Sequence, residues 1–330
     1  MKRLALLALF ALSAAISLPA QSPAPASAPA SVLLKPARVF DAISQTPHEG
    51  WVVLVTGNAI AAAGPAADVK APAGAKVIDL PGATLMPGLI DAHSHIYLHP
   101  YNEATWNDQV MKETLAYRTV AAVIYCKDTL LAGFTSLRDL GTEGAEYADV
   151  SVQKAINEGR ISGPRLQVAT KAIVASASYG PGPRGFATNF TLPRGAEEVS
   201  GVDQMLWAVR DQIGHGADWV KLYADYRRGP NGSNVPTLNL AEMQAAVEES
   251  KSAGRPVAVH ASHPEGMRRA VVADAQTIEH GYGGTDETSM MLHLAPHLVD
   301  MAAATRNVPE QLAANRYVRF GGAVGFGWLS

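Results

Sequence analysis

The sequence predicts an α/β fold, a (β/α)8 barrel of the TIM type with about six strand–helix units present and a small β-sandwich portion before it. Two observations predict this fold. From residue 86 onward, strand-like runs alternate with helical stretches, which is the pattern of a parallel sheet. Nearly every strand-like run also ends in a polar or ionisable residue. In a barrel, the carboxyl ends of the strands form the mouth of the active site.

The first residues precede this fold. Residues 1–20 begin with Lys2 and Arg3 and continue as an apolar run that is too short to cross a bilayer. This pattern is typical of a signal peptide cleaved after Ala20, although an uncleaved anchor is the alternative. Residues 21–31 are a spacer rich in Pro, Ala and Ser. We therefore expect an exported protein, periplasmic or secreted, without a stable membrane anchor.

The predicted β-sandwich portion covers residues 32–85. Short β-rich runs at 32–34, 52–55 and 77–80 are separated there by Gly and Pro residues. This pattern is typical of part of a small β-sandwich.

The predicted barrel covers residues 86–300, and residues 301–330 form an atypical, Gly-rich tail. The tail is too short for two further strand–helix units. Strand-like runs occupy 85–95, 134–139, 165–169, 219–223, 256–260 and 277–280. Helical patterns occupy 104–132, 203–213, 240–252 and 265–273, and one further helix is expected at 308–315. Asn239 or Thr237 is expected to cap the 240–252 helix, and Gly254 to end it.

Composition narrows the classes of partner. The 330 residues carry a formal net charge of −3, with both signs mixed along the chain. Neither nucleic acid nor an anionic membrane surface is therefore expected as a partner, whereas a homo-oligomer is compatible with the sequence. The single cysteine, Cys126, excludes an intramolecular disulfide, and its apolar surroundings predict a small buried side chain.

The most informative motif is LMPGLIDAHSHIYLHP at residues 85–100. His93 and His95 are two residues apart near the end of a predicted strand, so their side chains point to the same side. Two imidazoles on one side can share a cation. A bare His-x-His is common, but Pro87 and Gly88 before the strand and Asp91 before the first histidine make the metal interpretation stronger.

Several segments together resemble one enzyme family. PGLIDAHSH is similar to the metal-binding signature of the amidohydrolase superfamily. Four further segments resemble, in the same order, its imidazolonepropionase-like branch, which includes prolidase-like dipeptidases and carboxypeptidases. These segments are GFTSLRDLG at 133–141, GADWVKLYAD at 216–225, GRPVAVHAS at 254–262 and TIEHG at 277–281.

The resemblance implies a set of metal ligands. His93 and His95 would hold the more buried ion, and Lys221, as a carboxylated lysine, would bridge two ions. His260 and His280 would hold the second ion. The implied cofactor is one or two divalent ions, above all zinc, because zinc suits histidine and carboxylate ligands. Manganese, cobalt and iron are the alternatives.

Each of these residues also has an ordinary interpretation. His260 is compatible with a core histidine at a strand end, and His280 with a residue in a supporting position or a loop. The aliphatic part of Lys221 is compatible with a side chain that extends to solvent. Four strand ends with these residue types in the expected order nevertheless favour a metal centre.

Other residues are candidates for supporting the ligands or contacting the substrate. Asp91 precedes the first ligand, and Arg138 and Asp139 are expected to form an ion pair that supports His93 and His95. Tyr223 and Arg227 follow Lys221 and are expected to face the substrate, with Arg227 receiving a carboxylate, unless they belong to a solvated loop.

The loop at residues 178–186 is rich in Gly and Pro and is expected to lie over the mouth. The remaining histidines considered are predicted to be surface or packing residues: His99, His215, His263, His293 and His297.

The resemblance implies a hydrolase that cleaves carbon–nitrogen bonds by a metal-activated water, of the Xaa-Pro dipeptidase or carboxypeptidase kind. Its substrate would be a small molecule or a dipeptide. The family's last ligand, an aspartate that ends strand eight, has no counterpart here, because Asp286 and Asp300 lie in no recognisable strand-end motif. Two alternatives stay open: a truncated, non-catalytic metal-binding relative, and a hydrolase of lactones or cyclic amides.

Overall fold

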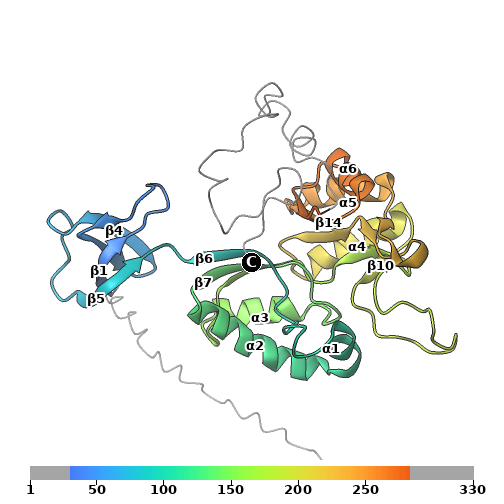
Figure 1. The fold of residues 1–330 in the computed structure, drawn as a ribbon, viewed down its shortest axis with the longest axis horizontal. Coiled ribbons are helices and arrows are strands. Elements are labelled where there is room, and N and C mark those ends of the chain that lie inside the picture. Colours follow the sequence, from blue (N-terminus) through green and yellow to red (C-terminus); the bar gives the residue numbers. More distant parts are fainter. Residues whose placement is uncertain (1–29, 283–330) are drawn as a thin grey trace, which may run out of the picture. The chain divides into compact units, whose positions relative to one another are not determined.

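A computed structural model describes residues 30–282, and the chain divides into two compact units between Pro87 and Gly88 (Figure 1). The predicted signal peptide, nearly all of the spacer and the tail at 301–330 lie outside the described residues, as do Asp286, Asp300, His293 and His297. Within residues 30–282, no helix is both long and apolar enough to pass through a membrane.

The first unit is a five-stranded sheet. Strand β1 (Ser31–Val39) pairs antiparallel with β2 (His48–Glu49) and β3 (Trp51–Thr56). Strand β3 continues antiparallel to β4 (Ala59–Pro65), and β5 (Lys76–Leu85) runs parallel to β1. The β-rich runs of the sequence therefore lie inside longer strands, and the described part of the predicted sandwich is one sheet.

The second unit begins with a parallel three-stranded sheet. Its strands are β6 (Leu89–Ser94), β7 (Phe134–Asp139) and β8 (Arg165–Val168), in chain order. Two helices, α2 (Leu115–Leu131) and α3 (Ala148–Asn157), pack beside these strands (Figure 1). The prediction placed these three strands within a few residues.

A second parallel sheet carries the later strands. Its order is β10 (Glu197–Val199), β9 (Ile173–Ala175), β11 (Val220–Tyr223), β14 (Val257–Ala261) and β15 (Thr277–His280). The carbonyl of Val168 accepts hydrogen bonds from the amides of Asp218 and Trp219 at 2.8 and 3.1 Å, so β8 adjoins the start of β11. The six predicted strands correspond to β6, β7, β8, β11, β14 and β15, which follow one another in chain order, whereas the short strands β9 and β10 were not predicted.

Three helices accompany this second sheet: α4 (Val202–Gly214), α5 (Leu240–Ser252) and α6 (Pro264–Val272). Asn239 caps α5 in a capping box with Glu242, and Gly254 follows the helix with φ of 67°. A short antiparallel pair, β12 (Asp225–Tyr226) and β13 (Val235–Pro236), and a 3-10 turn (Pro230–Gly232) lie between β11 and α5.

The sequence prediction differs from the structure at two helices. The periodic stretch at 104–132 is two helices, α1 (Trp106–Lys112) and α2, because Glu113 and Thr114 adopt extended conformations. Thr114 then caps α2 through its side chain. Helix α3 was not predicted.

Apolar side chains between helices and strands form two main cores. One lies between β7, β8, α2 and α3 and contains Cys126, Leu137 and Val168, so the prediction that Cys126 is buried is confirmed. The other contains Leu222 and Val259 on the sheet and Met205 and Met243 on the helices. Because these residues face the helices, their neighbours along each strand face away from them.

Candidate metal and active site

Four imidazole rings gather at the carboxyl ends of β6, β14 and β15. His93 lies in β6, His95 directly follows it, and His260 and His280 lie in β14 and at the end of β15. The ring centres of His93 and His280 are 4.7 Å apart, those of His260 and His280 4.6 Å, and those of His93 and His95 5.3 Å. We refer to these four residues as the histidine cluster.

Lys221 on β11 is buried completely beside the cluster. Burial is the main cause that lowers its pKa to about 7, and the positive charge of Arg138 contributes. The charge of Lys221 in turn lowers the pKa of His93 and of His260, although burial is the larger cause for both. A neutral amine is therefore well populated near neutral pH.

Glu279 on β15 orients His93. Its Oε2 lies 2.7 Å from His93 Nδ1, and its Oε1 accepts from Arg138 at 2.8 Å and from Thr277 at 2.6 Å. Burial would raise the pKa of Glu279, but these donors and the charge of Lys221 lower it to about 2. Because the ionised carboxylate can only accept, Nδ1 of His93 carries the proton and Nε2 has a free lone pair.

The ring of His95 has the same arrangement. Its Nδ1 lies 2.9 Å from the carbonyl oxygen of Gly141, which can only accept a hydrogen bond. Nδ1 therefore carries the proton in the neutral ring, and Nε2 remains available. Fixing one ring nitrogen through a hydrogen bond is how proteins usually orient a histidine that ligates a metal.

His260 and His280 have a different environment. Burial lowers the pKa of His260 to about 2 and that of His280 to about 4, so both rings are neutral at physiological pH. Tyr223 stacks on His260, with ring centres 4.4 Å apart and planes 13° apart. In the part of the chain that the structure describes, Nδ1 of His260 and Nζ of Lys221 are buried and have no hydrogen-bond partner.

Imidazole nitrogens are suitable ligands for a metal ion such as zinc, but within the described residues the geometry does not bring three of them to one point. Across residues 30–282, no three His, Cys, Asp or Glu side chains are arranged to hold an ion as they stand. The Lys221 side chain beside the histidine cluster ends in an amine, and its positively charged form cannot ligate a metal ion. The two orphaned buried nitrogens mark the places where an additional ligand would make contacts.

The sequence-predicted supporting residues behave differently from one another. Asp91 accepts a hydrogen bond from the amide of His93 at 3.1 Å. Arg138 donates to Glu279, the carboxylate that also binds His93. Asp139 does not pair with Arg138, so that expectation was wrong. Alternate strand residues face opposite sides. Asp139 is therefore buried on the helix side, where it accepts from the amide of Ile96 at 3.3 Å.

Tyr223 is buried against His260, whereas Arg227 is exposed just beyond β12. The three described histidines that were predicted to lie apart from the cluster have structural surroundings. His99 lies between Glu103 and Glu113, His215 stacks on Tyr147, and His263 caps α6.

Sequence reasoning missed Glu279, and its position explains why. Neighbouring strand residues normally face opposite sides, so Glu279 and His280 were not expected in one site. His280 has φ of 73°, which ends the strand and turns its ring toward the cluster. Glu143, buried near His95, was also missed because it lies in a loop without a motif of its own.

Comparisons with known proteins agree with this geometry. The pattern of the Amidohydrolase family matches residues 84–319. An ochratoxinase of Aspergillus niger is 29% identical over 220 residues, which cover 59% of this chain and 43% of that protein. The chain thus spans less than half the length of this relative.

Solved structures give the same result. A Xaa-Pro dipeptidase with methionine bound in its active site superposes with a TM-score of 0.69 and 26% identity, over 80% of this chain and 65% of that one. A prolidase complexed with N-methylphosphonate-L-proline superposes with a TM-score of 0.67 and 28% identity, over 80% and 64% of the two chains. Together with the histidines at the strand ends, the family match over residues 84–319 shows that this chain belongs to the amidohydrolase family.

Proposed function

We propose that the protein is a metal-dependent hydrolase that cleaves a carbon–nitrogen bond in a small amide or dipeptide. The observation that carries the proposal is the convergence of four imidazole rings beside a fully buried lysine whose amine has no partner among the described residues. The similarity to a Xaa-Pro dipeptidase and to a prolidase supports a dipeptide-like substrate.

The residues divide naturally between two positions. His93 and His95 each present a free Nε2, because Nδ1 is held by Glu279 or by Gly141, and would hold one ion. His260 and His280 would hold a second. When bound, one or two divalent ions, above all zinc, lower the pKa of a bound water and polarise the carbonyl of the substrate.

Lys221 would link the two positions as a carbamate. Its neutral amine attacks the carbon of carbon dioxide, so that the N–C bond forms as one C=O π bond opens. One proton then leaves the nitrogen for solvent, and the side chain ends in an N-carboxylate with two oxygens and one negative charge. The lowered pKa of Lys221 supplies the neutral amine that this step requires. Nζ of Lys221 is buried and has no hydrogen-bond partner among residues 30–282. A carbamate at this position would offer two oxygens for contacts that the amine lacks.

The mouth supplies groups for a substrate. Arg227 is exposed next to Tyr226, and we propose that its guanidinium receives the carboxylate of a dipeptide. The general acid and base is not assigned, since the strand-eight aspartate of the family has no counterpart among residues 30–282.

Metal content per chain tests the proposal. Protein purified with zinc should retain one or two equivalents, whereas His93→Ala and His95→Ala should each lose the ion held by that pair. His215→Ala is the matched control, because this histidine stacks on Tyr147 outside the cluster. Full retention by both His93→Ala and His95→Ala would refute the metal site. A panel of Xaa-Pro dipeptides and acyl-amino acids would then define the substrate of metal-loaded protein.

A further inference from the structure

The carboxylate of Glu143 is buried among the loops that follow the strands. Glu143 lies between β7 and α3, in the left-handed region with φ of 51°, and is only 2% exposed. A buried carboxylate is costly unless donors surround it. Its donors therefore show which segments the residue holds together.

Those donors come from three separate segments. Trp106, the first residue of α1, donates through Nε1 to Oε2 of Glu143 at 2.9 Å. Tyr179, in the segment after β9, donates to the same oxygen at 2.5 Å. Tyr223, the last residue of β11, approaches Oε1 at 3.4 Å. Hydrogen bonds to an ionised acceptor are stronger than those between neutral groups.

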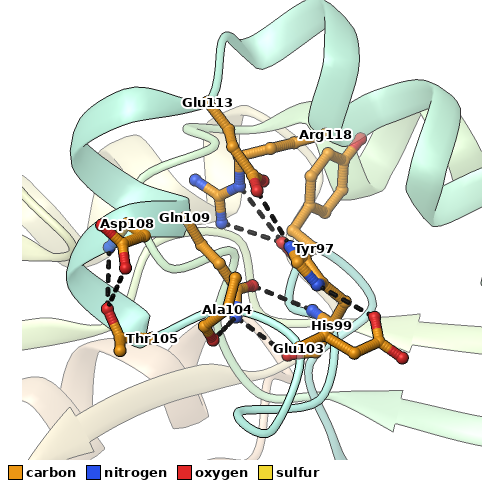
Figure 2. A network of polar contacts seen from close by, with 9 residues as sticks. All are labelled: Tyr97, His99, Glu103, Ala104, Thr105, Asp108, Gln109, Glu113 and Arg118. Carbon is orange, nitrogen blue, oxygen red and sulfur yellow. Dashed lines mark hydrogen bonds and ion pairs between the residues drawn. The ribbon is translucent and has the colours of Figure 1, made fainter.

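The segment that presents Trp106 is itself fixed (Figure 2). Gln109 is completely buried and donates to the carbonyls of His99 and Ala104, while it accepts from the amide of His99. The buried guanidinium of Arg118 donates to the carbonyls of Tyr97 and Thr142. Because Thr142 directly precedes Glu143, one network holds both sides of the contact between Trp106 and Glu143.

Close packing leaves the segment 178–195 little freedom near this contact. A Cβ atom on Gly195 would lie 2.5 Å from the ring of Trp106, and one on Gly180 would lie 3.0 Å from it. The ring of Tyr179 also lies 5.0 Å from that of Tyr223, which stacks on His260. The contacts of Glu143 therefore continue through aromatic rings to the histidine cluster.

Glu143 also lies beside the other side of the cluster. Its Oε1 is 3.8 Å from Nδ1 of His95, which donates to Gly141. A negative charge at this place stabilises the protonated Nδ1 and the orientation of the ring.

We propose that Glu143 is a positioning residue: its carboxylate holds α1 and the segment 178–195 together through Trp106 and Tyr179, and it orients the ring of His95. The first part concerns the metal-free protein and is independent of catalysis. The part that concerns His95 rests on the proposed metal site.

Limited proteolysis of the metal-free protein tests the first part. Arg184 is exposed in segment 178–195 and offers a trypsin site there, and Arg210 on α4 offers an internal reference site. Glu143→Gln keeps the size of the side chain but removes its charge and one acceptor oxygen. We expect cleavage after Arg184 to become about 10-fold faster relative to Arg210, the scale expected for loss of charge-assisted hydrogen bonds.

Glu198→Gln is the matched control, because this glutamate pairs with the exposed Arg194 of the same segment. Its ratio of cleavage at the two sites should stay within about twofold of the wild type. An unchanged ratio in Glu143→Gln would overturn the proposal, and so would an equal acceleration at both sites, which indicates general loss of stability. If Glu143→Gln does not fold, Tyr179→Phe removes one donor only and should still raise the ratio.

Cobalt(II) tests the part that concerns His95. The visible spectrum of cobalt-loaded Glu143→Gln should differ from that of the wild type, whereas Glu198→Gln should match the wild type. Identical spectra would refute the role in orienting His95. A wild-type protein that takes up no cobalt would count against the proposed function, while the proteolysis result would still decide the role of Glu143 in the loops.

Discussion

The two halves of the histidine cluster differ in how completely their polar atoms are paired. His93 and His95 each have Nδ1 bound to an acceptor, Glu279 for one and the carbonyl of Gly141 for the other. The other half consists of His260 and His280, together with the adjacent Lys221. In this half, Nζ of Lys221 and Nδ1 of His260 are buried without a partner among the described residues. One half is oriented by the protein alone, and the other is incomplete.

This difference indicates where the fold carries an energetic cost. A buried polar atom without a partner destabilises the folded state, whereas a paired one is nearly neutral or favourable. The rings of His93 and His95 are therefore already oriented by hydrogen bonds within the folded chain. The unpaired half gains the most when a new group arrives, and a carbamate on Lys221 would be such a group. Substitutions at Glu279 and at Lys221 test this comparison, and one at Asp149 tests a group outside both halves.

The largest effect is expected in the paired half. Glu279→Leu would leave Arg138, whose side chain is only 13% exposed, without its partner and would release His93. Removing one member of a buried ion pair typically costs about 3–5 kcal/mol of unfolding free energy. Urea unfolding of the metal-free protein measures it. Glu279→Gln, which keeps an acceptor, should lose only about 1–2 kcal/mol; equal losses in both variants would contradict the importance of the charge.

A group outside both halves is expected to contribute to the pH dependence of stability near neutrality. Asp149 on α3 accepts from the amides of Thr170 and Val150, and burial raises its pKa to about 7. The folded protein then holds a proton that the unfolded chain releases above pH 4, so this contribution to stability falls as pH rises toward 7. Asp149→Asn abolishes it.

The difference in unfolding free energy between wild type and Asp149→Asn should therefore change by about 2–3 kcal/mol between pH 5 and pH 8. Urea midpoints of both proteins at the two pH values measure this change. A difference that stays constant with pH would show that Asp149 is ionised throughout the range.

The smallest effect has the opposite sign and belongs to the unpaired half. Lys221→Met replaces a buried amine that has no partner within residues 30–282, and it should stabilise the metal-free protein by about 1–3 kcal/mol. Metal content per chain should also fall, because methionine cannot form the carbamate that would link the two ion positions. Lys171→Met is the matched control, since Lys171 pairs with Glu197 and lies 4.6 Å from the ring centre of Tyr147. Lys171→Met removes this ion pair and should destabilise the protein. If Lys221→Met lowers the unfolding free energy as much as Lys171→Met does, the comparison is refuted.

Much of the site could be predicted because strand periodicity is a local property. The spacing of His93 and His95 and the strand-like runs around Lys221, His260 and His280 could be read along the chain. The structure places β11, β14 and β15 side by side in one sheet, and the ring of His93 on β6 lies 4.7 Å from that of His280. The same rule failed for Glu279, because the positive φ of His280 breaks the alternation at the last residue of β15. Strand alternation also explains why the predicted ion pair between Arg138 and Asp139 does not form, because adjacent residues of β7 face opposite sides.

The sequence by itself determined the α/β alternation, the order of the strands and which ionisable residues end them, because these depend on local periodicity and residue type. The tertiary structure decided which of those residues are paired. Glu279 contacts His93 across 186 positions of the chain, and Trp106, Tyr179 and Tyr223 meet at Glu143 from three separate segments. Such contacts depend on how distant segments pack and on which polar atoms become buried, and local sequence patterns predict neither of these.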